Sequence, residues 1–122
     1  MISAYPTFQV RLRTTRALEE VASRLSHLLQ IQFYTSSDIP LQEDETGMVA
    51  HSLGLQLNLI RWELESGGPA VFIFSGTLEP RLDPHLSETF KANSISSYMV
   101  EVLWALDSSE WYIPTLDEIS AE

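Results

Sequence analysis

The first part of the chain alternates apolar and polar side chains and then changes to a helical spacing. Residues 8–13 alternate strictly, which is the period of a strand with one buried face. Over residues 16–29 apolar side chains recur every three or four positions, so we expect one amphipathic helix, with Thr14 and Thr15 available to cap it. The apolar positions of this helix are Leu18, Val21, Ala22, Leu25, Leu28 and Leu29.

The middle of the chain has the pattern of several short strands. We expect strands at residues 31–34 and 48–51, and a longer one at 55–62 in which leucines alternate with polar residues. Residues 66–69 contain two glycines and a proline and predict a turn. The apolar run 70–76 should return beside 55–62 as its antiparallel partner.

The last third predicts a loop, a second helix and a final strand. Residues 78–93 contain two prolines and favour a surface loop, with one helical turn near residues 86–90. A second amphipathic helix should begin near Ser94 or Ser96 and end near Asp107, and residues 111–113 should form a short strand. We therefore predict a single α+β domain over residues 1–122, with two helices on one face of a largely antiparallel sheet of five to six strands.

The chain is strongly acidic, with 17 Asp and Glu against 7 Lys and Arg and a net charge of -10. This charge repels nucleic acid and anionic lipid and attracts basic proteins, so we expect neither a nucleic acid nor a membrane as partner. Lys91 is the last basic residue, and the thirty-one positions after it hold six acids. These acids are Glu101, Asp107, Glu110, Asp117, Glu118 and Glu122.

The composition also indicates the cellular compartment that we expect for this protein. The chain has no cysteine, which excludes disulfides and thiolate metal sites and fits a reducing environment. Its first ten residues lack the basic and apolar regions of a signal peptide, and no stretch approaches the roughly 18 apolar residues of a membrane-spanning helix. We expect a cytoplasmic protein.

No group of residues predicts catalysis or cofactor binding. The three histidines are scattered, and Asp83 with His85 would give only two ligands to a metal ion. Ser52 follows His51 but lacks the glycine pattern of a nucleophile elbow, and Glu63 with Glu65 are best interpreted as exposed carboxylates at a strand end. We therefore expect no enzyme, no metal and no cofactor.

The candidate contact residues are acids that interrupt apolar patterns, together with one aromatic side chain. Trp111 lies among acids and is a possible anchor for a protein partner, although each of the three tryptophans could instead be core. The predicted partner-binding residues are Glu43, Asp44, Glu45, Asp107, Glu110, Trp111, Asp117 and Glu118.

Three stretches carry a resemblance to a known class. The run 53–59, the helix from Ile95 to Leu103, and Glu110 with Trp111 and Tyr112 together resemble small bacterial immunity proteins of polymorphic toxin and contact-dependent inhibition systems. The resemblance covers about the last seventy residues and implies a role more than an architecture. Proteins of that class are short, acidic and non-catalytic, and neutralise a toxin that is often a basic nuclease.

The expected function is therefore that of a non-enzymatic inhibitor, which covers a basic toxin with its acidic surface. The alternative is an adaptor or secretion chaperone that binds a larger protein without inhibiting it.

Overall fold

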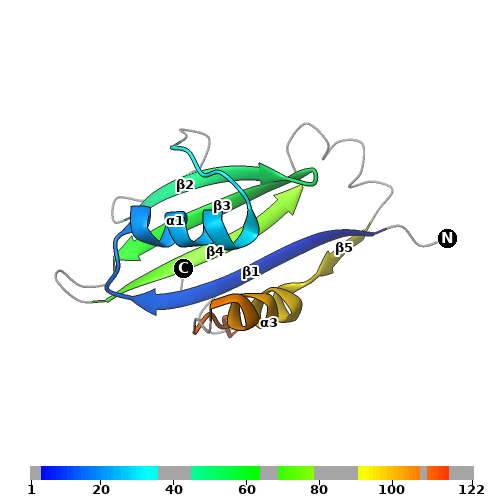
Figure 1. Ribbon diagram of the computed structural model, residues 1–122. Helices are drawn as coiled ribbons and strands as arrows, with labels where there is room; N and C mark the ends of the chain where they lie inside the picture. The colour runs from blue at the N-terminus through cyan, green and yellow to red at the C-terminus, as the bar shows by residue number, and fades with distance from the viewer. Residues whose placement is uncertain (1–3, 36–44, 64–68, 79–90, 108–109, 116–122) are drawn as a thin grey trace.

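The computed structural model describes residues 4–35, 45–63, 69–78, 91–107 and 110–115. Within these ranges the chain forms five strands and two helices. Figure 1 shows how they are arranged. The strands form one sheet in the order β2-β3-β4-β1-β5, so the predicted α+β fold is confirmed. The elements are β1 (Ala4–Thr14), α1 (Leu18–Leu29), β2 (Glu45–Ser52), β3 (Leu55–Glu63), β4 (Ala70–Leu78), β5 (Lys91–Ser94) and α3 (Ser96–Asp107).

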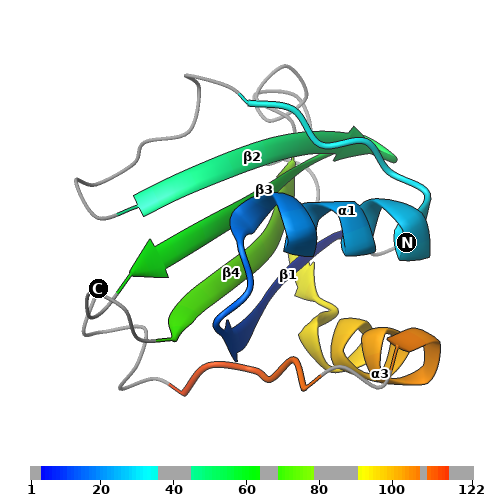
Figure 2. The ribbon, with the colours of Figure 1, turned by 60° about the vertical axis from the view of Figure 1, so that its left-hand side comes forward.

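The pairing of the strands is antiparallel except at one edge. β3 pairs with β4 over its whole length, as the sequence predicted, and β4 pairs in turn with β1. β2 and β3 are joined by a two-residue turn at Leu53 and Gly54. β5 runs parallel to the first residues of β1 at the opposite edge. Figure 2 shows the twist that these strands share.

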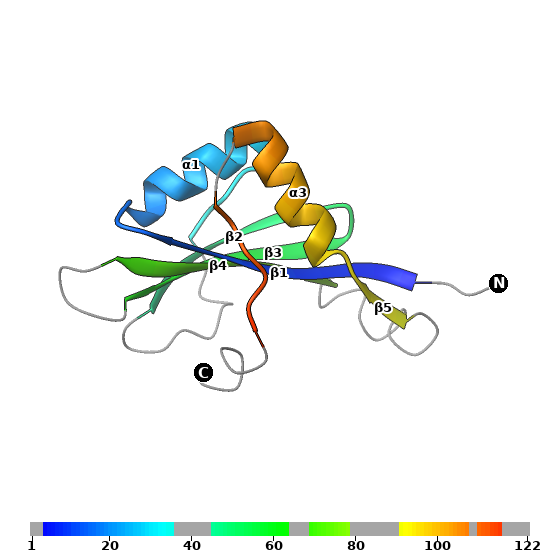
Figure 3. The ribbon, with the colours of Figure 1, turned by 90° about the horizontal axis from the view of Figure 1, so that it is seen from below.

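Both helices cover the same face of the sheet, as predicted, and Figure 3 shows them together on one side. The core lies between them and the sheet. Strand alternation sends Val10, Leu59 and Phe74 toward the helices, and all three are fully buried. Each such apolar side chain stabilises the fold by roughly 1.5–3 kcal/mol through burial. From α1 the core receives Val21 and Leu25.

One glycine in this core makes room for an aromatic ring. Gly76 pairs with Phe8 on one side and with Leu57 on the other. A Cβ atom at Gly76 would lie 2.5 Å from Cε1 of Phe8 and 3.1 Å from Cδ2 of Leu57. The position of the Phe8 ring over the sheet therefore depends on the missing side chain.

Three local predictions need correction. α1 begins at Leu18 with Ala17 as N-cap and without a side-chain cap, so Thr14 and Thr15 do not cap it. The strands expected at residues 31–34 and 111–113 are each a single bridge, from Tyr34 to Val49 and from Tyr112 to Arg11.

The loop predicted over residues 78–93 also needs correction. Leu78 ends β4, and Lys91 begins β5, a strand that the sequence pattern did not indicate. Residues 79–90, including the expected helical turn, lie outside the described residues.

Candidate functional site: an exposed aromatic helix face and an apolar groove

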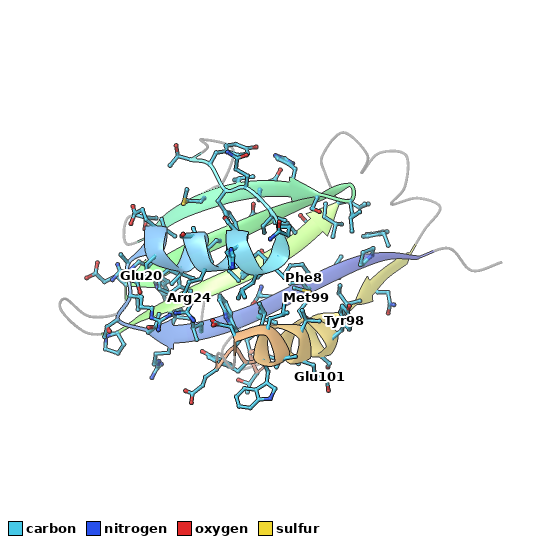
Figure 4. The ribbon with its side chains drawn as sticks, in the orientation of Figure 1. Phe8, Glu20, Arg24, Tyr98, Met99 and Glu101 are labelled. Atoms are coloured by element: carbon cyan, nitrogen blue, oxygen red, sulfur yellow. The ribbon has the colours of Figure 1, made fainter. Side chains whose placement is uncertain are left out.

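The outward side of α3 carries two large aromatic side chains. Tyr98 is 63% exposed and Trp104 is 60% exposed. Residues three or four positions apart share one side of a helix, so Glu101 lies between these two rings and Ala105 lies beside it. Figure 4 shows Glu101 on the side of α3 away from α1. We call Tyr98, Glu101, Trp104 and Ala105 the outer face of α3.

The outer face of α3 differs from the exposed side of α1, which carries polar side chains as amphipathic helices usually do. α1 turns apolar side chains inward and exposes polar ones, including Glu19, Glu20 and Ser23. α3 buries Met99 and Leu103, yet it remains apolar around much of its circumference. Exposed aromatic side chains clustered on a helix are typical of a surface that another molecule covers.

An apolar groove lies next to this face, between α1, α3 and the turn that joins β2 to β3. Its volume is about 240 Å³. Phe8 forms part of its base, Leu29 belongs to one wall, and Met99 and Tyr98 belong to another. Figure 4 shows Phe8 and Met99 between the two helices. Since Tyr98 contributes to both, the groove and the outer face of α3 form one continuous site.

The chemistry of the groove is almost purely apolar. Hydroxyl groups of Ser52 and Tyr98 are the polar side-chain groups among the described residues that line it, and none of these residues is charged. An ion placed there would lose its hydration without a compensating partner. The groove is therefore suited to an uncharged apolar group.

Leu53 lies at the edge of the groove in a conformation that costs free energy. Its φ is 53° and that of Gly54 is 78°, as in the two-residue hairpin turns that favour Asn and Gly. A leucine in the left-handed region is destabilised by about 1–2 kcal/mol. The Leu53 side chain is also 96% exposed, so burial in the isolated protein offsets little of this cost.

The predicted anchor Trp111 is wrong, because this side chain belongs to the core. It is only 6% exposed and packs against Phe74, with ring centroids 6.1 Å apart. The cause is the backbone of the next residue: Tyr112 exchanges two hydrogen bonds with Arg11, at 2.8 and 2.7 Å. This pairing holds the segment against β1 and directs Trp111 toward the helices.

Asp107 is also not a free surface charge. Both its carboxylate oxygens accept hydrogen bonds from the guanidinium of Arg24, with Nε to Oδ2 at 3.2 Å and Nη2 to Oδ1 as the second contact. Asp107 therefore joins α3 to α1. Glu110, by contrast, is exposed, as predicted.

The remaining predicted contact residues fall largely outside the described part of the chain. Glu43, Asp44, Asp117 and Glu118 lie outside it. Glu45 begins β2 and pairs with Trp62, but its side chain is not among those described. The structure thus leaves these acids as predictions.

The arginines near the N-terminus do not form an open basic patch. Arg11 is buried, and its Nη2 donates to Oε1 of Gln9 at 3.3 Å. Arg16 forms an ion pair with Glu20 at 3.3 Å, and Arg24 contacts Asp107. Arg13 is exposed.

The described ranges contain no group of three His, Asp or Glu residues that could hold a metal ion.

The Tyr34 hydroxyl forms a hydrogen bond with Nε2 of His51, and the two rings stack at the exposed edge of β2. Within the same ranges, neither helix combines the length and apolar character needed to cross a bilayer.

Comparison of the chain with family models, with curated proteins and with solved structures gave no match.

Sequence reasoning missed Trp104, Tyr98 and Leu53 as site residues. A helical projection gives the signal for the first two, since they lie to either side of the buried pair Met99 and Leu103 and outside the stripe that this pair forms. For Leu53 the signal is the following Gly54 between two strand patterns, which places the leucine at a hairpin tip.

Proposed function

We propose that this protein is a non-enzymatic immunity protein, which binds a basic toxin domain through the outer face of α3 and thereby neutralises it. One observation carries the proposal: Tyr98 and Trp104 are exposed on either side of Glu101. They lie in a stretch of thirty-one residues that holds six acids and no basic residue. Nucleic acid and membrane are not partners in this proposal.

Charge and aromatic area have separate parts in the proposed binding. Carboxylates such as Glu101 and Glu110 attract a basic surface and accelerate its approach, an effect that salt weakens. Tyr98 and Trp104 offer large apolar surfaces that become buried and lose their bound water in the complex. This burial slows dissociation. A toxin that cleaves nucleic acid has a basic groove for phosphates, and an acidic protein seated beside or over that groove blocks the substrate.

The test uses the protein encoded by the gene next to this one. Bacteria that express its C-terminal domain alone should stop growing, and co-expression of this chain should restore growth. In solution, the purified chain at equimolar concentration should abolish the activity of that domain.

Two variants sharpen the test. The double change Glu101→Lys with Trp104→Ala should remove protection while leaving the protein folded. Glu20→Lys makes the same charge change on α1, outside the site, and should retain protection. A complex that forms without loss of toxin activity would favour an adaptor or secretion chaperone instead, and the absence of any complex would refute the proposal.

A further inference from the structure

We infer that a hollow on the face of the sheet away from the helices binds a small uncharged molecule with several hydroxyl groups, of the kind that a monosaccharide represents. The hollow lies where β4, β1 and β5 run side by side, and its volume is about 430 Å³. Small-molecule sites have volumes of roughly 300–1,000 Å³. The inference does not rest on the proposed function, because the residues of the outer face of α3 are not among those that line the hollow.

Strand alternation gives the hollow its polar floor. Phe8 of β1 points toward the helices, so its neighbours Thr7 and Gln9 point to the other face. The pairing register sets Gln9 beside Ser75 of β4, and Thr7 beside Ser94 of β5. Hydroxyl and carboxamide groups from neighbouring strands therefore meet on this face. The polar side chains that line the hollow are Thr7, Gln9, Ser75, Thr77, Ser94 and Ser96.

Several of these polar groups are available to a ligand. In the part of the chain that the structure describes, the hydroxyl groups of Thr7, Ser75 and Thr77 have no hydrogen-bond partner. Oε1 of Gln9 accepts a hydrogen bond from Nη2 of Arg11, which leaves the amide nitrogen of Gln9 to donate to a ligand. Each hydroxyl group can both donate and accept. A sugar hydroxyl has the same two capacities, so the two kinds of group are complementary.

The serines of the hollow are fixed before a ligand arrives. Ser96 is only 9% exposed, and its Oγ accepts a hydrogen bond from the backbone N–H of Gln9 at 3.0 Å. Oγ of Ser94 lies 3.2 Å from Oγ of Ser96. These contacts tie the end of β5 and the start of α3 to β1. A site that is already ordered loses less conformational entropy when its ligand binds.

The rest of the lining is apolar and sets the character of the ligand. The segment after α3 crosses the edge of β1, as Figure 3 shows, and brings Ile113 and Pro114 beside the hydroxyl groups. No charged side chain lines the hollow within the described ranges, so a phosphate or carboxylate would lose its hydration there without a compensating partner. A neutral sugar offers hydroxyl groups at the edge of its ring and C–H groups on the faces, which match the two kinds of lining.

The direct test is an NMR titration of the isotope-labelled protein with glucose, galactose and N-acetylglucosamine, which share a ring but differ in their substituents. At least one of them should shift the amide signals of Gln9, Ser75 and Ser96 in a saturable manner at millimolar concentration. Glucuronate and galacturonate carry a carboxylate on the same rings and should bind about five times more weakly than glucose and galactose. Shifts that are absent or unsaturated with all three neutral sugars up to about 100 mM would overturn the inference. Equal binding of the acids would overturn the assignment of an uncharged ligand.

Removal of hydroxyl groups tests whether the sugar lies in the hollow. The double change Thr7→Val with Thr77→Val keeps the branched side chains that strands favour. It should weaken binding of the sugar about ten-fold or more, because each hydrogen bond contributes about three- to ten-fold to affinity. Ser75→Ala is a second variant and should weaken binding about three-fold or more. Thr46→Val makes the same kind of change on β2, outside the hollow, and should leave binding unchanged. Unchanged affinity in the first two variants would refute the site.

Failure of the inference can be distinguished from failure of the proposed function. The double variant at Thr7 and Thr77 should still protect against the toxin, because it leaves the outer face of α3 intact. If no sugar binds while the unmodified chain protects, the immunity role stands and the hollow is not a sugar site. If a sugar binds and the unmodified chain gives no protection, the hollow is a binding site and the immunity role is wrong. Loss of protection in the folded double variant would show that the hollow contacts the toxin and would overturn the assignment of a small molecule.

Discussion

The guanidinium of Arg24 donates to both carboxylate oxygens of Asp107 and so joins the middle of α1 to the last residue of α3. The two residues are 83 positions apart in the chain. Both side chains are partly buried. A bidentate arginine–carboxylate pair of this kind fixes the relative orientation of the two groups as well as their distance. The contact holds α3, whose outer face and N-terminal half form the proposed site, in place against α1.

A double-mutant cycle measures this contact. Arg24→Gln and Asp107→Asn should each lower the free energy of unfolding, with a coupling of about 1 kcal/mol, because the pair is only partly exposed. The exposed pair Arg16 and Glu20 is the matched control, with an expected coupling of about 0.3 kcal/mol. Urea denaturation of the two sets of variants measures both coupling free energies. Equal couplings would show that the first pair does not hold the helices together.

The two tryptophans of the C-terminal third should respond oppositely to truncation. Trp111→Ala should lower the free energy of unfolding by about 3–5 kcal/mol, because it empties a core site against Phe74. Trp104→Ala should change stability by only about 0.5 kcal/mol, because that side chain is mostly exposed. Denaturant unfolding followed by circular dichroism compares them. A large loss of stability with Trp104→Ala would mean that the ring is structural and not a contact residue.

Gly76 and Phe8 should be energetically coupled. Gly76→Ala places a methyl group against the Phe8 ring and should destabilise the protein by about 1–3 kcal/mol. In combination with Phe8→Leu, which removes the atoms nearest to the new methyl, the extra cost of the alanine should fall by about 1 kcal/mol. Thermal unfolding of the single and double variants measures this. Simple additivity would show that the ring and the glycine are independent.

The regular elements could be predicted because the spacing of their apolar side chains along the chain matches the side of each element that is buried. The residues of α1 and the leucines of β3 follow one period each, and both elements are confirmed with small shifts at their ends. β5 could not be found this way, because its sequence, Lys91–Ser94, is polar and its strand state comes from pairing with residues 4–7 of β1. Tertiary pairing of this kind leaves no local signal.

The site was predicted less well than the fold, because burial of an aromatic residue depends on distant partners. Trp111 and Trp104 both lie among acids in the sequence, and either could serve as an anchor. The backbone pairing of Tyr112 with Arg11 decides between them by turning Trp111 inward. The exposed tryptophan of this region is Trp104, which was not among the predicted contact residues.

Association and dissociation kinetics with the C-terminal domain of the neighbouring gene's product measure directly whether the outer face of α3 binds the toxin. We expect Glu101→Lys to slow association several-fold at low salt and Trp104→Ala to accelerate dissociation by about ten- to thirty-fold. Glu20→Lys should change neither rate appreciably. Rates for the Glu101 and Trp104 variants that equal those of the unmodified protein would contradict the claim, and the binding surface would then lie on another part of the molecule.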